Sequence, residues 1–433
     1  MKFLTLLLFF IITPQIATAE SEWSFGADMN MTEFYYPEQY GEDTNDSLFK
    51  LELDPMVRWK KGDRWRVYSK PVLVANPDNK STEEQFYFDP SETYIKFQKD
   101  VLDIYVGYNV VTWGITDGYN PIDIVNRRQL YDPLRSKKMG TPSILISESL
   151  KWIDYDLIYI PSAREAILPG ENSRWLPREV FVPQVPGNDL VLLLPPNLRY
   201  TWGNEAILDD ALENNFAIRL QKTISIFDFA ITGYDGAASA PIIEPQVTGT
   251  IVEVSPKTVI QVDPDVRLDT KQYRIRQGGF SLVSRQWDFL FKYATTYSDN
   301  YGDYVNLPGW IHESILGVEK TFNFSDAMLI AVVQYSFLDT ERKNDSNISI
   351  TEIFRRAWMA GGRLSWKEVW NASLLGLYDT VHSSTFVEVT LGRRFFDSWN
   401  ASLTANFISG DIENPLGLYS KNDAYILSVG RSF

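Results

Sequence analysis

The stretch WNASLTANF, residues 399–407, alternates without a break between apolar and polar side chains. One face carries Trp399, Ala401, Leu403, Ala405 and Phe407, and the other face carries Asn400, Ser402, Thr404 and Asn406. A period of two places successive side chains on opposite faces of a β-strand. The stretch is therefore predicted to be a strand with one apolar and one polar face, and aromatic residues stand at both ends of its apolar face.

The same period recurs along the chain, for example in VLDIYVGY (101–108) and RQWDFLFKYATTY (285–297). Alternating segments of about ten residues, separated by turn formers, are typical of transmembrane β-barrels. We predict an all-β fold: an antiparallel, up-and-down transmembrane barrel of about 16–18 strands. The expected strands are 22–34, 47–60, 64–75, 92–98, 101–108, 143–151, 153–161, 197–203, 214–223, 226–234, 248–260, 273–284, 287–297, 313–322, 326–337, 353–366, 368–378, 384–393, 398–408 and 423–433. Of these, 197–203 and part of 248–260 are expected to lie in loops.

A soluble β-sandwich also alternates, but the composition favours the barrel. Aromatic residues make up 14% of the chain, with 13 Trp, 23 Tyr and 25 Phe. Such enrichment suits the aromatic girdles that surround a membrane barrel. The chain has no cysteine and a formal net charge of −15. Disulfides and thiolate metal sites are therefore excluded, and nucleic-acid binding is disfavoured.

The N-terminus predicts export. A lysine precedes the ten-residue apolar run FLTLLLFFII (3–12), and Ala17-Thr18-Ala19 gives the small-x-small pattern of a signal-peptidase site. We expect cleavage between Ala19 and Glu20. Residues 1–19 would then be a signal peptide, and residues 20–433 a single barrel domain in the bacterial outer membrane.

The C-terminal stretch AYILSVGRSF places Tyr425, Leu427, Val429 and Phe433 on one face. It resembles the C-terminal signal by which the barrel assembly machinery recognises outer-membrane barrels, a terminal Phe after alternating apolar residues. Arg431 departs from that pattern, because an apolar residue is more usual two places from the end.

Six arginines are expected to point into the lumen because each falls opposite the apolar face of its predicted strand. An arginine on the lipid side costs about 2–4 kcal/mol at mid-membrane. The expected acidic partners on the wall are Glu52, Asp103, Asp228 or Asp288. The six predicted lumen-facing residues are Arg64, Arg66, Arg219, Arg274, Arg276 and Arg363.

Residues 109–142 interrupt the alternation. They contain the turn pairs Trp113-Gly114, Asp117-Gly118, Asn120-Pro121 and Asp132-Pro133, interleaved with apolar residues and charges. A loop on the surface needs no such apolar residues, whereas a loop folded into the lumen must pack there. We therefore predict an inward-folded pore loop, in which Asp117 and Asp123 accept backbone N–H groups in tight turns.

The same insert carries a further resemblance, to a family of proteins. VGYNVVTWGITDGYNPIDIVNRR matches a WG-x-x-D-x-x-NP-x-D segment at Trp113, Gly114, Asp117, Asn120, Pro121 and Asp123. This segment resembles one found in a large, mostly uncharacterised family of Gram-negative outer-membrane barrels. The resemblance covers residues 101–145 and implies a porin-like fold and an outer-membrane location. The resemblance also implies a candidate partner, an inner-membrane exporter of hydrophobic molecules.

Five basic residues follow this segment: Arg127, Arg128, Arg135, Lys137 and Lys138. Three partners suit them, namely anionic lipopolysaccharide, an anionic solute, or carboxylates of the barrel wall. If the insert is the gate, neutralising these residues should reduce anion preference, and deleting 115–138 should raise conductance.

A second insert, 162–196, is rich in proline, which argues against long helices or central strands. Its apolar end, VLLLPP (191–196), would be an aggregation liability if exposed. The alternatives are packing on neighbouring loops, or contact with lipid or hydrophobic cargo at the barrel rim near the aromatic girdle.

No enzyme is expected. The only histidines are His312 and His382, and neither stretch resembles the motifs of outer-membrane phospholipases or proteases. No histidine or acidic cluster has metal-ligand spacing, so neither a metal nor any other cofactor is expected.

The expected function is a channel or transporter, either porin-like or an entry or exit route for hydrophobic or small solutes. The alternative is a non-transporting adhesin or assembly barrel. Outer-membrane lipid, lipopolysaccharide and a small-molecule solute are the expected partners.

Overall fold

The computed structural model describes residues 21–183, 189–301, 309–341 and 353–433. The predicted cleavage site at Ala19 and Glu20 lies outside these residues.

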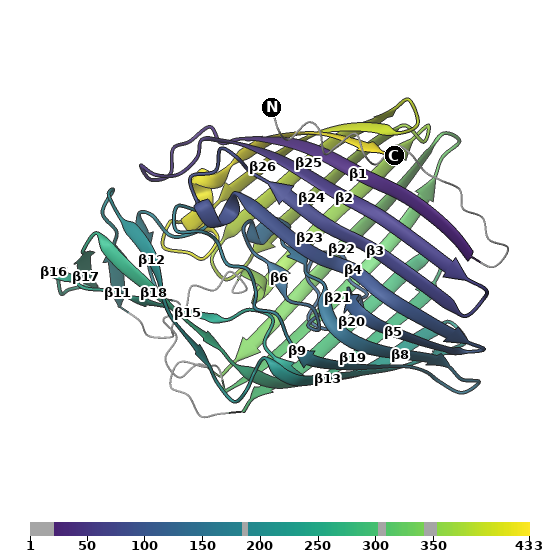
Figure 1. The fold of residues 1–433 in the computed structure, drawn as a ribbon. Coiled ribbons are helices and arrows are strands. Elements are labelled where there is room, and N and C mark those ends of the chain that lie inside the picture. The colour runs from purple at the N-terminus through teal and green to yellow at the C-terminus, as the bar shows by residue number, and fades with distance from the viewer. Residues whose placement is uncertain (1–20, 184–188, 302–308, 342–352) are drawn as a thin grey trace.

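Eighteen antiparallel strands form one closed sheet (Figure 1). Each wall strand pairs with the next wall strand along the chain, and β27 pairs with β1 to close the barrel. The wall consists of β1 (Ser21–Tyr35), β2 (Ser47–Lys61), β3 (Trp65–Ala75), β4 (Phe86–Lys99), β5 (Leu102–Asn109), β8 (Thr141–Ser149), β9 (Asp154–Ser162), β13 (Glu213–Ile224), β14 (Phe227–Ala237), β19 (Arg274–Gln286), β20 (Phe289–Asn300), β21 (Trp310–Asn323), β22 (Ala327–Thr340), β23 (Arg356–Trp366), β24 (Trp370–Asp379), β25 (Ser384–Phe395), β26 (Trp399–Ser409) and β27 (Ala424–Ser432). The predicted antiparallel barrel is confirmed, at the upper end of the predicted strand number.

The two open ends of the barrel differ. At one end, tight turns join the strands; in Trp287-Asp288, Lys367-Glu368 and Phe396-Asp397 both residues have positive φ. Positive φ at both central residues is what a type I′ hairpin turn requires. At the other end, long loops join the strands (Figure 1). Outer-membrane barrels have short periplasmic turns and longer extracellular loops, so the tight-turn end faces the periplasm.

The outward face of the wall is apolar and aromatic. In β26, Leu403 and Phe407 are 54% and 43% exposed, whereas Asn406 between them is 3% exposed. Aromatic pairs such as Trp23 with Trp59 and Tyr335 with Trp358 lie on this face at opposite ends of the barrel. This surface suits contact with lipid, and together with the fold it places the protein in the bacterial outer membrane.

The C-terminal strand β27 presents Tyr425, Leu427 and Phe433 outward, each between 45% and 61% exposed. Arg431 shares this face, and its guanidinium lies over the rings of Trp399 and Phe433 at 5.1 and 4.4 Å. At the periplasmic edge, an arginine can cover apolar surface with its stem and rings while its charge stays near water.

The extracellular loops form small sheets of their own beyond the barrel end (Figure 1). One sheet contains β10 (Val180–Phe181), β11 (Leu190–Leu193), β17 (Thr258–Val262) and β16 (Gly249–Glu253); the other contains β12 (Arg199–Ile207), β18 (Asp265–Gln272) and β15 (Ile242–Gln246). The segments 197–203 and 248–260 therefore lie in loops, as predicted.

Three short 3₁₀ helices and one two-stranded ribbon complete the elements described below. They are η1 (Thr82–Glu84), η2 (Pro133–Arg135), η4 (Gly417–Asn422), and the ribbon of β6 (Arg128–Gln129) and β7 (Lys137–Lys138). No helix in the described part of the chain is long and apolar enough to cross a membrane.

The main apolar core lies inside the barrel, toward its extracellular end. It joins Trp113 and Ile122 of the first insert, Trp175 and Leu176 of the second, and inward residues of the wall such as Ile315. The inserts therefore pack against the inner wall instead of standing free above it.

Candidate pore constriction and solute path

Residues 110–140, here called the lumenal loop, are fastened at their base by Asn126. Its side chain is 1% exposed. The Asn126 amide accepts from the Val111 N–H (2.7 Å) and donates to the carbonyls of Asn109 and Met139 (2.8 Å each). One buried amide thus ties the start of the lumenal loop to its end. Our sequence analysis missed this residue, because an asparagine among turn formers gives no signal of burial.

The Trp-Gly and Asn-Pro pairs have a structural role in the lumenal loop. A Cβ at Gly114 would lie 1.4 Å from Nδ2 of Asn120, so only glycine leaves room for this amide. The Trp113 side chain is buried in the core, with 4% of the residue exposed. The backbone N–H of Trp113 donates to Oδ1 of Asp123 at 3.4 Å. These contacts place the predicted residues Trp113, Asn120 and Asp123 in the fold of the loop itself.

The tip of the lumenal loop docks on the inner wall. Asp117 lies 3.0 Å from Nζ of Lys292 on β20 and 3.5 Å from the guanidinium of Arg363 on β23. The Gly118 N–H donates to Gln334 on β22 at 3.1 Å. The next residue, Tyr119, donates its hydroxyl to Glu313 on β21, and its ring stacks on Phe354 at 4.3 Å. The tip is thus held by four adjacent wall strands.

The basic end of the lumenal loop reaches a different part of the wall. Arg135 lies 2.8 Å from Glu388 on β25 and 2.8 Å from Asp132. Lys137 pairs with Glu52 on β2. Because the tip docks on β20 to β23 and the basic end docks on β25 and β2, the lumenal loop crosses the lumen.

The other three basic residues stay within or near the loop. Lys138 pairs with Asp123, and Arg128 donates to Ser136. Arg127 is 3% exposed and donates to Gln272 at 3.2 Å. Of the three partners considered for this basic run, the protein's own residues are the ones the structure provides.

Water-exposed charges line the inner wall on the side of β1 to β4. The inward face of β2 carries, from the extracellular to the periplasmic end, Lys50, Glu52, Asp54, Met56, Arg58 and Lys60. Asp28 on β1 pairs with Lys70 on β3 at 2.9 Å, yet its side chain stays 50% exposed. Lys137 is 51% exposed beside Glu52. An exposed ion pair inside a barrel indicates a solvent-accessible path beside the docked loop.

Four cations gather on the inward face near the periplasmic end, and we call them the basic belt. Lys60 on β2, Arg66 on β3 and Lys96 on β4 are direct cross-strand neighbours, and Arg58 lies one inward position above Lys60. Lys96 is held by Asp103 at 2.7 Å, and Glu22 is the cross-strand neighbour of Lys60. Arg58 and Arg66 are exposed and have no carboxylate within ion-pair distance among the described residues.

The six arginines that were predicted to face the lumen lie in three kinds of place: the inward face, a periplasmic turn and the outward face. Arg66, Arg219 and Arg363 lie on the inward face, where Arg219 is opposite Asp156 and Arg363 contacts Asp117. Arg64 lies in the tight turn between β2 and β3.

The prediction was wrong for Arg274 and Arg276, which lie on the outward face of β19 beside Asp235. At the extracellular end, the polarity of the wall reverses. Inward Ile275 is 6% exposed against the loop core, and the outward residues stand beyond the hydrocarbon. The inside is therefore apolar and the outside is charged.

The apolar stretch 191–196 belongs to the extracellular sheets. Val191 and Leu192 are each 6% exposed, and β11 pairs in parallel with β17, with Leu192 opposite Ile260. Of the two alternatives for this stretch, the buried positions of Val191 and Leu192 favour packing between loops over a cargo site at the rim.

The two histidines are far from forming a hydrolytic site. Nδ1 of His382 lies 2.6 Å from Oδ2 of Asp379, and Asp379 also accepts from the Val381 N–H in the turn between β24 and β25. Among the described residues, the Ser384 hydroxyl donates to the His382 carbonyl oxygen at 3.5 Å and not to the His382 ring. His312 lies on the outward face near Thr295 and Ser314.

No protein-family model matches the sequence, and no curated protein matches it. Solved structures do match the fold. OccK5 (OpdH) of Pseudomonas aeruginosa is 8% identical, with a TM-score of 0.52 over 96% of this chain and 98% of that chain. OccK2 (OpdF) of the same organism is 9% identical, with a TM-score of 0.50 over 95% and 98%. OpdQ of P. aeruginosa is 8% identical, with a TM-score of 0.50 over 95% and 97%. The chain therefore has the fold of outer-membrane porin barrels.

Proposed function

We propose that this barrel is a channel that admits small polar solutes along the wall of β1 to β4, past a constriction formed by the lumenal loop. The observation that carries the proposal is the crossing of the lumen by a loop docked on both sides. It leaves exposed charges beside the remaining passage, such as Asp28 on the wall and Lys137 on the loop itself. Fixed charges in a narrow pore select permeating ions by sign. The resemblance of the loop segment 113–123 to one found in a family of uncharacterised outer-membrane barrels supports the same kind of protein, although it names no solute.

The basic belt supports a preference for anions at the periplasmic mouth. Arg58 and Arg66 are uncompensated there, whereas the cations of the lumenal loop are mostly held by carboxylates or by the loop itself. Hydrophobic cargo has less support, because Val191 and Leu192 are buried between loops.

The test is single-channel recording in planar bilayers with a loop-tip deletion. Residues 115–121 form the tip, and the contact between Trp113 and Asp123 holds its flanks close, so removing the tip leaves the Asn126 anchor intact. The deletion should raise conductance. A matched control shortens the exposed turn 254–257 of the extracellular sheet, which should leave conductance unchanged. Equal conductance in the tip deletion and the wild type would remove the constriction from the proposal.

One observation favours the second candidate, a surface interaction barrel. The edge strand β16 is exposed throughout, and Ile251, Val252 and Val254 are 59%, 58% and 73% exposed. Edge strands of this kind can pair with strands of other chains. Absence of any conductance from correctly folded wild-type protein would favour this candidate over the channel.

A further inference from the structure

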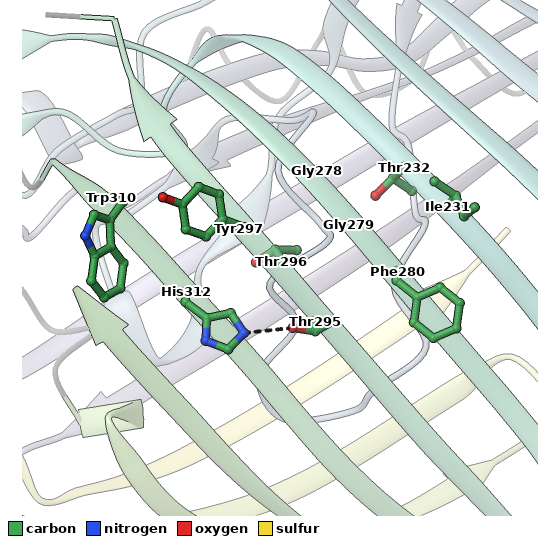
Figure 2. Close-up of a pocket in the computed structure, with 10 residues that line it drawn as sticks. All are labelled: Ile231, Thr232, Gly278, Gly279, Phe280, Thr295, Thr296, Tyr297, Trp310 and His312. Carbon is green, nitrogen blue, oxygen red and sulfur yellow. Dashed lines mark hydrogen bonds between the residues drawn. The ribbon is translucent and has the colours of Figure 1, made fainter. Parts of the chain in front are cut away.

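The outward face of β14 and β19 has a gap in its side-chain cover. Gly233 and Gly278 are direct cross-strand neighbours, and a Cβ at Gly278 would meet nothing within 4 Å. On the next two strands, Tyr297 lies opposite Gly278, and His312 lies opposite Tyr297. We call this gap the glycine shelf. Figure 2 shows the hollow around it, which Ile231, Phe280, Thr295, Tyr297, Trp310 and His312 line.

The glycine shelf faces the membrane and not the lumen. Ile231 and Tyr297 are 58% and 54% exposed, whereas the alternate residue Thr296 is 1% exposed. A Cβ at Gly279, one residue from the shelf, would lie 3.6 Å from Ile122 of the lumenal loop. Because neighbours along a strand point to opposite faces, Gly278 points outward.

Polar atoms stand at one side of the glycine shelf. Thr295 Oγ1 lies 3.2 Å from Nε2 of His312 and 2.8 Å from Oγ of Ser314 (Figure 2 shows the first contact). His312 and Ser314 lie near the extracellular end of β21, and Thr295, the cross-strand neighbour of Ser314, lies near the middle of β20. These atoms can bond to hydroxyl or ester groups of a molecule lying on the shelf, in a region where apolar side chains are otherwise the rule.

An exposed cation stands above the glycine shelf. Arg276 is two residues from Gly278 on the same face, toward the extracellular end, and its side chain is 68% exposed. Its guanidinium lies 4.0 Å from the centroid of the Tyr301 ring and 3.7 Å from Asp235, and Asp299 is its cross-strand neighbour. Arg274, in contrast, is 13% exposed and 2.7 Å from Asp235. Arg276 is therefore the more exposed of the two arginines and the one that an anion outside the barrel can reach.

We propose that the glycine shelf binds the phosphorylated glycolipid of the outer leaflet. In this arrangement one acyl chain lies on the bare backbone of Gly278, between Ile231, Phe280 and Tyr297. The headgroup phosphate bonds to Arg276, because guanidinium and phosphate geometry match. The location at the extracellular end selects an outer-leaflet lipid. This site lies outside the lumen and is independent of the channel proposed above.

The test titrates the purified full-length barrel with lipid A, and separately with phosphatidylglycerol, and counts bound lipids by native mass spectrometry. Arg276→Gln removes the cation, and Gly278→Leu fills the shelf. Arg276→Gln should weaken lipid A binding about tenfold, which is the scale of one lost charge-assisted hydrogen bond. Gly278→Leu should weaken it by about the same factor, because the leucine occupies the place of the acyl chain. Both variants should keep the wild-type conductance and the heat-modifiable mobility of a folded barrel.

Two matched controls sit on the outward face away from the glycine shelf. Gly376→Leu fills a glycine position on β24, and Arg393→Gln removes an arginine stacked on Trp370 at 4.8 Å near the periplasmic end. Neither should change lipid A binding. Wild-type affinity in Gly278→Leu and Arg276→Gln would overturn the proposal. Equal affinity for lipid A and phosphatidylglycerol would overturn the glycolipid assignment.

Discussion

Asp117 at the tip of the lumenal loop lies 3.0 Å from Nζ of Lys292 on the barrel wall, and Glu319 holds the same ammonium at 2.7 Å. Lys292 is 10% exposed, and Asp117 is 28% exposed. The contact is therefore partly shielded from water, and it is one of the fastenings that keep the tip against the wall. If Asp117 loses its charge, Lys292 still has Glu319, so no buried cation is left alone.

Asp117→Asn should loosen the loop tip without unfolding the barrel. A hydrogen bond to a charged group contributes about 1.5–3 kcal/mol, and the remaining contacts of Gly118 and Tyr119 keep the tip near the wall. We expect more frequent current steps in single-channel recordings and an unchanged thermal unfolding temperature. Asp100→Asn, in a tight periplasmic turn, is the control and should behave as wild type. Identical current traces for all three proteins would contradict a mobile constriction.

Neutralising the basic belt should lower anion preference. In water, a unit charge about 10 Å from a permeating ion contributes about 0.4 kcal/mol, or roughly a twofold change in local ion concentration. Each removed charge lowers the local anion concentration and raises the local cation concentration about twofold. Arg58→Gln together with Arg66→Gln should therefore shift the reversal potential in a salt gradient toward cation selectivity, with a fall of about sixteenfold in the anion-to-cation permeability ratio. Arg393→Gln, on the outward face, should leave the reversal potential unchanged. A belt variant with wild-type selectivity would place the filter elsewhere in the lumen.

Alternation alone located the wall, because the lipid and the wet lumen impose opposite polarities on successive residues of a strand. It failed where the surroundings change. At the extracellular end of β19, Ile275 packs inward on the loops and Arg276 stands outward beyond the hydrocarbon core of the membrane. Extending one inward–outward alternation along the whole strand therefore assigns Arg274 and Arg276 to the wrong face.

The lumenal loop was predictable in part. Its apolar residues and turn pairs indicated that it folds inward, but its docking partners come from strands far away in sequence, such as Glu313 and Glu388. No local pattern marks such pairs. The role of Gly114 became clear only from the position of the Asn120 amide.

Leu192→Ala should weaken the extracellular sheets and leave the wall intact. Leu192 is 6% exposed, and truncation of a buried leucine costs about 2–5 kcal/mol. Protease cleavage within 163–212 should accelerate, while heat-modifiable mobility and conductance stay at wild-type levels. Leu374→Ala, whose side chain is 52% exposed on the outward wall, is the control. Reduced permeation of an apolar solute with unchanged protease resistance would instead restore a cargo role for this stretch.

Glu84 should make the attachment of the second insert depend on pH. This residue, in η1 of an extracellular loop, is 6% exposed and accepts from the Gly170 N–H at 2.6 Å and from Asn79 at 3.0 Å. Burial raises the pKa of its carboxyl above the ordinary value of 4.5, and the Gly170 N–H opposes this only in part. The folded state thus prefers the protonated form.

A carboxyl whose pKa is raised by folding stabilises the fold below its unfolded pKa, and that contribution is lost as the pH rises through the folded pKa. The protection of the peptide around Gly170 can be measured by hydrogen–deuterium exchange, with Glu84→Gln as the reference at each pH. In the wild type this protection should fall from about pH 4.5 upward. In Glu84→Gln the amide oxygen still accepts from the Gly170 N–H, but no second oxygen remains to accept from Asn79. This loss lowers the protection by an amount that does not vary with pH. Asp43→Asn, on an exposed part of the loop between β1 and β2, should keep the wild-type profile. A constant difference between wild type and Glu84→Gln across this range would show that Glu84 stays ionised in the folded protein.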